Sequence, residues 1–199
     1  PVWIHAVSVG EVLAAKPLAA ALAAARPDLP VMVSTVTATG RELAGKELPM
    51  AAAVVYFPFD WKCCIARFLR RYRPRLVVIM ETELWPNFLR CCHKASVPML
   101  LANGRLSDRS FHRYRRVRDW LRPVLAQLSG IMVQTAADRE RFIAIGAPAR
   151  GVWVTGNLKF DFSLPAAAGD VDWLNRLRGC LGLEDARPVR DGTAPQNPF

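Results

Sequence analysis

His5-Ala6-Val7-Ser8-Val9-Gly10-Glu11-Val12 joins the first apolar run of the chain to its first helix-forming segment. The apolar run Val2-Trp3-Ile4 precedes it, and an alanine-rich segment follows it as far as about Ala25. An apolar run, a short loop of small residues and a helix-forming segment together predict a strand–loop–helix unit. In open α/β sheets, ligands bind in the loops at the carboxyl ends of the strands. The loop before Glu11 is therefore the first candidate for a functional site.

Glu11 is the only acidic residue of this unit, and it stands where the predicted helix begins. The positive end of a helix dipole favours the ionised form of a nearby carboxyl group, which suits a general base at the mouth of a cleft. The same position also suits an ordinary first-turn acid that only stabilises its helix. The stretch by itself leaves both interpretations open.

Further along the chain, apolar runs alternate with helix-forming segments. This alternation predicts an α/β fold with a parallel sheet and helices on both faces. The run at 76–80 is almost unbroken, which is typical of a strand buried on both faces. The expected strands after the first are 30–35, 53–57, 76–80, 97–101, 130–134 and 152–155. After the first helix, a second is expected to begin near 41, and a third is expected at 61–71 with Asp60 as its cap. Two more are expected at 108–128 and about 138–145.

The composition indicates a basic protein with ample material for a core. The chain has 199 residues, 52% of them hydrophobic, and a formal net charge of +10. Such a charge fits a polyanionic partner, namely a nucleic acid, phosphorylated sugars or an anionic membrane face. The five cysteines are mostly adjacent in sequence and lack zinc-site spacing, which favours reduced thiols in a cytosolic protein. The three histidines are scattered and predict no metal site.

The loop after the buried strand reads Glu81-Thr82-Glu83-Leu84-Trp85-Pro86-Asn87. Neighbouring carboxylates raise one another's pKa, so that one of them can hold or donate a proton near neutral pH. The alternative is a helix start with acids in its first turn, which Pro86 supports.

Two later loops carry groups suited to anions. In Asn103-Gly104-Arg105-Leu106-Ser107, Gly104 permits close backbone approach and Arg105 offers a planar fork for phosphate or carboxylate; the alternative is a surface turn. In Thr155-Gly156-Asn157-Leu158-Lys159, Lys159 follows a Gly-Asn turn and suits an anion contact.

The segment 108–128 is strongly basic. Such a run is commonly a solvated helix face, and the functional alternative is contact with anionic lipid head groups or phosphates. It lacks the interleaved aromatic residues of a base-stacking platform, so a nucleic acid is the least favoured partner.

These loops, with Thr35–Gly40, Ser110 and Tyr114, occur in an order and spacing that resemble the N-terminal half of 3-deoxy-D-manno-octulosonic acid (Kdo) transferases, over about residues 2–161. The resemblance implies a GT-B glycosyltransferase, in which two Rossmann-like domains face each other across a cleft. Residues 1–162 would then form the Rossmann-like acceptor domain. A CMP-Kdo donor domain would follow it.

The resemblance also implies a reaction and the residues that perform it. Kdo passes from CMP-Kdo to the lipid A precursor lipid IVA with inversion, at the cytoplasmic face of the inner membrane, without a metal or cofactor. Glu11 corresponds to the catalytic base, and Glu83 and Lys159 correspond to groups that support the transition state. The implied acceptor-binding residues are Ser8, Gly10, Thr37, Gly40, Asn103, Arg105 and Ser107.

The C-terminal part departs from the family pattern. Residues 163–189 read as a linker and a helix, and 190–199 are polar and turn-rich where the first strand of the donor domain is expected. The sequence therefore predicts a truncated chain without transferase activity of its own. Two rival hypotheses are a GT-B half that serves another nucleotide sugar and a non-enzymatic basic domain that binds a membrane surface or nucleic acid.

Overall fold

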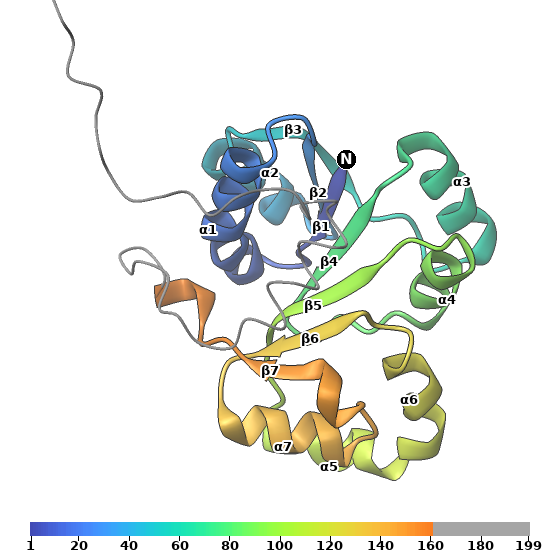
Figure 1. Ribbon diagram of the computed structural model, residues 1–199. Helices are drawn as coiled ribbons and strands as arrows, with labels where there is room; N and C mark the ends of the chain where they lie inside the picture. Colours follow the sequence, from blue (N-terminus) through green and yellow to red (C-terminus); the bar gives the residue numbers. More distant parts are fainter. Residues whose placement is uncertain (161–199) are drawn as a thin grey trace, which may run out of the picture.

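Short runs rich in β-branched and other apolar residues form one sheet of seven parallel strands in the computed structural model, which describes residues 1–160 (Figure 1). The strands are β1 Val2–His5, β2 Val31–Thr35, β3 Ala51–Tyr56, β4 Leu76–Met80, β5 Met99–Gly104, β6 Gly130–Val133 and β7 Val152–Val154. Every residue of β1, β2, β4 and β5 is buried, as expected for a sheet that is covered on both faces.

The strand order is β3-β2-β1-β4-β5-β6-β7. β1 pairs with β2 on one side, with Val2 opposite Val31, and with β4 on the other, with Val2 opposite Leu76. The chain therefore winds outward in one direction from β1 to β3, and in the other direction from β4 onward. The carboxyl ends of β1 and β4 form the topological switch point, which is the usual ligand position in sheets of this kind.

Helices connect the strands and cover both faces of the sheet, so the predicted α/β fold class is confirmed (Figure 1). The helices are α1 Val9–Ala25, α2 Ala38–Glu47, α3 Lys62–Tyr72, α4 Pro86–Lys94, α5 Asp108–Arg116, α6 Arg118–Leu125 and α7 Ala136–Ala144. Two short 3₁₀ turns, η1 Ala149–Gly151 and η2 Leu158–Phe160, lie on either side of β7.

The alternation of side chains along β1 divides the core into two layers. Val2 and Ile4 pack with the alanine face of α1 and with α2, whereas Trp3 points to the opposite face, where α3 and α4 lie. Trp3 contacts the rings of Phe68 and Phe88 at centroid distances of 4.4 and 5.0 Å. Burial of each such large side chain contributes about 1.5–3 kcal/mol. This aromatic layer extends to His5, the last residue of β1, where the loop that leads to Glu11 begins.

Two local predictions are wrong. The segment 108–128 forms two helices, α5 and α6, that break at Val117, because α6 turns so that Leu121, Val124 and Leu125 are buried while no residue of α5 is buried. Asp60 does not cap α3, whose N-cap residue has no side-chain hydrogen bond. The Asp60 carboxylate instead accepts the backbone N–H groups of Asn87 and Phe88 at the start of α4.

The predicted linker and helix at 163–189 and the predicted tail at 190–199 lie outside the described residues. Within residues 1–160 no helix has the length and apolar character needed to cross a membrane. Cys63, Cys64, Cys91 and Cys92 are free thiols, as the sequence predicts.

Candidate active site

The loops that follow β1, β4, β5 and β7 meet at the carboxyl edge of the sheet. Lys159, in η2, has its Nζ 3.7 Å from Oε1 of Glu81, in the loop after β4. A Cβ built on Gly10 would lie 3.8 Å from the same Nζ. Thr82 donates its hydroxyl hydrogen bond to the Arg105 carbonyl at 2.5 Å, which joins the loops after β4 and β5. The topology thus brings four polar loops, distant in sequence, to one place.

Glu11 is held in a fixed position by its own turn. Its carboxylate accepts the Val7 backbone N–H at 2.8 Å and the Ser8 hydroxyl at 2.9 Å. Ser8 is the N-cap of α1 and in turn accepts the Glu11 backbone N–H at 3.4 Å. This is a variant of the capping box. Glu11 is therefore a first-turn acid that stabilises its helix, which is one of the two interpretations that the sequence left open. The capping hydrogen bonds also orient its carboxylate.

The environment of Glu11 gives it the acidity of a general base. Burial raises its pKa from the ordinary value of 4.5 to about 7, although the hydrogen bonds from Val7 and Ser8 oppose this, and the charges of Glu83 and Glu81 add to it. The helix position alone predicts the opposite direction, towards the ionised form. Burial prevails because Glu11 is only 6% exposed and desolvation disfavours its charge.

Glu81 and Glu83 precede α4 and do not belong to its first turn, which begins at Pro86 and holds no acid. The Glu83 carboxylate accepts the indole N–H of Trp85 at 3.1 Å. Burial raises the pKa of Glu83, the Trp85 bond opposes this, and the charge of Glu81 adds to it. Glu81 adopts a left-handed backbone conformation with φ of 54°, which is uncommon for a residue with a side chain. Backbone strain of this kind concentrates at functional sites.

A cavity of about 350 Å³ joins four of these predicted residues, Glu83, Arg105, Ser107 and Lys159. Glu11, Ser8 and Gly10 are not among its lining residues. They adjoin it: a Cβ built on Gly10 would lie 3.8 Å from the Lys159 ammonium, and the charges of Glu83 and Glu81, which line the cavity, act on Glu11. The other residues that line the cavity are Glu81, Thr82, Leu106, Ser110, Arg113 and Tyr114.

The remaining predicted residues shape the loops. The Thr37 hydroxyl caps α2 by accepting the Gly40 N–H at 3.0 Å. A Cβ on Gly40 would lie only 2.7 Å from the Thr37 hydroxyl oxygen, so the absence of a side chain at Gly40 leaves room for the hydroxyl that caps α2. Ser107 is the N-cap of α5 and accepts the Ser110 N–H at 3.2 Å. Their contact with an acceptor stays a prediction.

Asn103 is 1% exposed and lies at the end of β5 rather than in the loop that the sequence predicts. Its side-chain oxygen accepts the Leu158 N–H at 3.1 Å, while its carbonyl accepts the Gln134 amide at 3.2 Å. Asn103 thus anchors η2, the turn that carries Lys159.

Of the site residues that are absent from the predicted set, three add charge to the site or hold its loops in place. Glu81 pairs with Lys159, and Arg113 lines the cavity from α5. The buried Asp138 accepts the Leu106 N–H at 2.9 Å and so fixes the loop beside Arg105. The Thr135-x-x-Asp138 cap at the start of α7 is visible in the sequence, but its contact with another loop is not.

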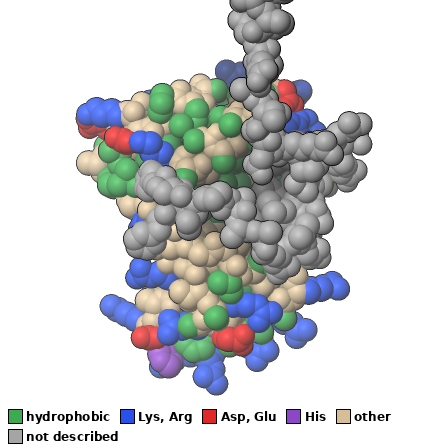
Figure 2. Space-filling model, turned by 60° about the vertical axis from the view of Figure 1, so that its left-hand side comes forward, with side chains coloured by type: hydrophobic (Ala, Val, Ile, Leu, Met, Phe, Trp, Pro, Cys, Tyr) green, Lys and Arg blue, Asp and Glu red, His purple; other side chains and the backbone are tan. Residues whose placement is uncertain are grey.

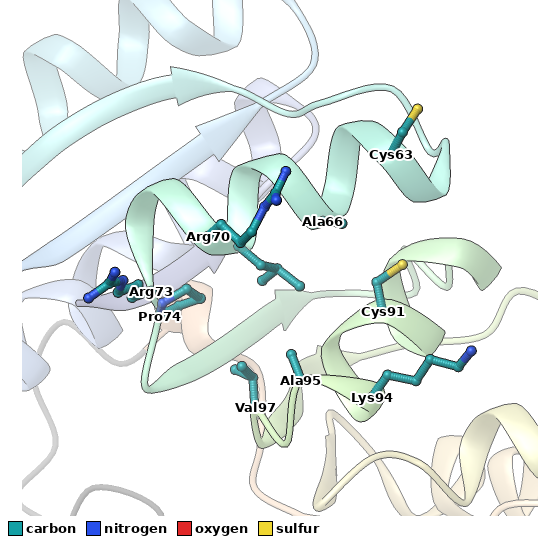
Figure 3. A pocket seen from close by; sticks show the side chains of 10 residues that line it. Cys63, Ala66, Arg70, Arg73, Pro74, Cys91, Lys94, Ala95 and Val97 are labelled. Atoms are coloured by element: carbon teal, nitrogen blue, oxygen red, sulfur yellow. The ribbon is translucent and has the colours of Figure 1, made fainter.

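A larger cavity, of about 750 Å³, lies between α3 and α4, away from these loops (Figure 3). Its lining includes Leu69 and Val97, the thiols of Cys63 and Cys91, and the basic Arg70. No acidic residue lines it, so it offers no second pair of carboxylates. The described residues also contain no group of three or more His, Cys, Asp or Glu side chains placed to hold a metal ion.

The chain matches a known protein family over most of its length. The model of the family described as 3-deoxy-D-manno-octulosonic-acid transferase (Kdo transferase) matches residues 1–162. The chain belongs to the Kdo transferase family. This family match covers every loop of the candidate site.

Two curated Kdo transferases show the relationship in detail. The chain is 37% identical over 162 residues to 3-deoxy-D-manno-octulosonic acid transferase of Haemophilus influenzae, covering 81% of this chain and 38% of that protein. It is 41% identical over 174 residues to the Bordetella pertussis protein of the same name, covering 84% of this chain and 39% of that protein. The chain therefore spans about two fifths of the length of these relatives.

A solved structure supports the fold. The UDP-GlcNAc 2-epimerase from Neisseria meningitidis, bound to UDP-GlcNAc, superposes with a TM-score of 0.58 at 15% identity, covering 80% of this chain and 47% of that one. At this identity the likeness concerns the fold alone. It agrees with the Rossmann-like half of a GT-B fold that the sequence predicts.

Proposed function

We propose that this Kdo transferase chain supplies the acceptor side and the catalytic base for transfer of Kdo from CMP-Kdo to the lipid A precursor lipid IVA. The main support for this proposal is the Glu11 carboxylate, which is buried at the switch point of the sheet and has its pKa raised to about 7. The chain that carries it belongs to the Kdo transferase family. A general base works best when its pKa lies near the operating pH.

In the proposed step, an acceptor hydroxyl oxygen attacks the anomeric carbon of Kdo. A carbon–oxygen bond forms on one face of that carbon while the bond to the CMP phosphate breaks on the other, so the configuration inverts. CMP leaves with the electron pair of the broken bond. Glu11 accepts the proton of the hydroxyl, and its bonds from Val7 and Ser8 keep the carboxylate in place during the transfer.

Lys159 and Glu83 have separate electrostatic roles in this step. The Lys159 ammonium, 3.7 Å from the Glu81 carboxylate, stabilises negative charge on the departing CMP phosphate. Glu83 adds to the field that raises the pKa of Glu11 and keeps that base protonatable near neutral pH. The lipid acceptor enters along the cavity between Arg105 and Tyr114.

We place the reaction at the cytoplasmic face of the inner membrane. Support comes from the net charge of +10, which favours an anionic surface. Phe59 and Trp61, at the carboxyl edge of the sheet, are 75% and 66% exposed and stack on each other. Aromatic side chains of this kind suit a membrane interface.

The test is a transfer assay with CMP-Kdo and lipid IVA. The chain alone is expected to give no product, whereas a fusion to the remaining C-terminal part of the Bordetella pertussis relative is expected to give Kdo-bearing lipid. In that fusion, Glu11→Gln lowers the rate at least about 100-fold, in keeping with loss of a general base. The rate of the unsubstituted fusion rises as pH passes through about 7. Transfer that is unaffected by Glu11→Gln, or that requires a UDP-sugar, would contradict the proposal.

A further inference from the structure

Four basic side chains form a stripe on α5. Arg109, His112, Arg113 and Arg116 recur at intervals of three and four residues, which places them on one helix face over a length of about 10 Å. Among the described residues, these four alone line a cavity of about 510 Å³. Figure 2 shows Lys and Arg side chains and a His gathered at the end of the molecule where α5 and α7 lie in Figure 1. This group of four residues is termed the α5 stripe below.

The arginines of the α5 stripe have no salt-bridge partner among residues 1–160. The acid of the first turn of α5, Asp108, is paired with Arg141 of α7. Like charges at such spacing destabilise a helix. The helix dipole favours Arg113 and Arg116 near its C-terminal end, but it disfavours Arg109 in the first turn.

The helix that carries the stripe turns its basic face to solvent. α5 has nine residues, none of them fully buried, and it contacts the core through the half-buried Phe111 and Tyr114. A bound anion would remove the charge repulsion along the exposed face.

The α5 stripe adjoins the candidate active site. Arg113 lines both the stripe cavity and the 350 Å³ cavity that contains Glu83 and Lys159. Ser110 and Tyr114, on the neighbouring face of α5, line the active-site cavity as well. One ligand can therefore place an anionic group on the stripe and a sugar hydroxyl in the active site.

We propose that the α5 stripe binds a phosphate monoester of the glycolipid acceptor and thereby sets the position of its sugar in the active site. This inference rests on the proposed function. Guanidinium forks bind phosphate oxygens through paired hydrogen bonds, and a phosphate monoester carries up to two negative charges. A phosphodiester head group of a bilayer carries only one negative charge and two non-bridging oxygens, against up to two charges and three such oxygens in a monoester, so the monoester can engage more arginines.

Binding of small probes to the full chain tests this site without any transfer reaction. Glucosamine 1-phosphate is titrated into ¹⁵N-labelled chain, with glucosamine as the control that lacks phosphate. The phosphate probe is expected to shift the amide signals of 109–116 and to slow their hydrogen exchange, and glucosamine is expected to do neither. Equal binding of both probes would overturn the proposal.

Arg109→Ala/Arg116→Ala is the test variant, because neither residue lines the active-site cavity and neither is buried. It is expected to weaken binding of glucosamine 1-phosphate at least ten-fold. Arg67→Ala/Arg71→Ala removes the same charge from exposed positions on a different helix, α3, and is expected to leave binding within two-fold. Equal weakening by both double variants would mean a general charge effect and would overturn the site.

Vesicles separate a phosphate monoester from a bilayer surface. Phosphatidylglycerol vesicles, which carry only phosphodiesters, are expected not to displace glucosamine 1-phosphate from the chain. Displacement would assign the stripe to the membrane and overturn the proposal. Because these measurements need no Kdo transfer, a failed transfer assay with intact phosphate binding refutes the proposed function alone, and the reverse result refutes this site alone.

Discussion

Glu11 shows how one residue serves two purposes. Its carboxylate takes two hydrogen bonds from its own helix start, and burial still raises its pKa to about 7. An ionised carboxylate has about four acceptor positions, so the two bonds leave capacity to accept a proton from a substrate. The capping interaction therefore fixes the carboxylate and leaves it able to act as the proposed base.

The raised pKa of Glu11 predicts a specific dependence of stability on pH. Between about pH 4.5 and 7 the unfolded chain has lost the Glu11 proton while the folded chain retains it, so this group contributes stability at low pH that is lost as pH rises. The loss is on the order of 3 kcal/mol. Glu11→Gln should remove this component, so its stability relative to the unsubstituted chain should increase between pH 5 and pH 8 in urea unfolding. Parallel pH profiles of the two proteins would count against the raised pKa.

His5 predicts the opposite slope. Burial lowers its pKa to about 3, although a hydrogen bond to Ser34 opposes this. The ring stacks on Phe57 at a centroid distance of 4.1 Å, and its Nε2 is buried without a partner. Its contribution is present above about pH 6.5 and is lost as pH falls towards 3, by an amount on the order of 5 kcal/mol.

His5→Phe keeps a ring against Phe57 and cannot be protonated. We therefore expect its urea midpoint to fall less than that of the unsubstituted chain when pH is lowered from 7.5 to 5. A variant that loses stability in acid as steeply as the parent would show that His5 is not the group responsible.

At the scale of single elements, α4 depends on a residue outside itself. Its start lacks a local side-chain cap, and Asp60, in the loop after β3, accepts the N–H groups of Asn87 and Phe88 at 3.2 and 2.7 Å. The Asn87 amide returns a hydrogen bond to the Asp60 carbonyl at 2.7 Å. Asp60 thus joins the loop after β3 to the helix that follows the Glu81–Glu83 loop.

Removal of this cap should be measurable. Asp60→Ala is expected to cost about 1–2 kcal/mol in the free energy of unfolding, because two helix N–H groups lose their acceptor. Asp60→Asn keeps one acceptor oxygen and is expected to cost less. The measurement is thermal unfolding by circular dichroism, and an unchanged Tm for Asp60→Ala would refute the capping role.

At the scale of the whole molecule, the sheet requires close contact between β5 and β6. A Cβ on Gly104 would lie 2.6 Å from a Leu101 methyl group, 3.1 Å from Val133 and 3.2 Å from the Met132 carbonyl oxygen. Gly104 follows Asn103, so this contact also holds the strand end that anchors Lys159.

Gly104→Ala is therefore expected to destabilise the fold by about 1–3 kcal/mol through overpacking. Gly45, on the exposed side of α2, is the matched control, because a Cβ there meets no atom within 4 Å. Gly45→Ala should stabilise the chain by up to about 1 kcal/mol, since alanine favours helix. Urea unfolding measures both effects, which are expected to have opposite signs, and a neutral Gly104→Ala would contradict the close packing.

Local patterns were sufficient for much of this protein. Apolar runs and helix signals predict the parallel sheet, and the ordered loop motifs indicate the family, because both depend on neighbours in the sequence. The same local patterns wrongly predicted that Asp60 caps α3 and that α5 and α6 form one continuous helix. Each error arose where a contact between distant segments outweighed the local preference.

The α/β fold class, the family and the positions of Glu11, Glu83 and Lys159 just beyond strand ends could be predicted from the amino-acid sequence. Three features came only from the folded chain: burial outweighs the helix dipole at Glu11, Asn103 anchors the Lys159 turn, and Arg113 lines two cavities. Desolvation and long-range hydrogen bonds depend on what surrounds a side chain in space. Those surroundings come from segments that lie far apart in the sequence.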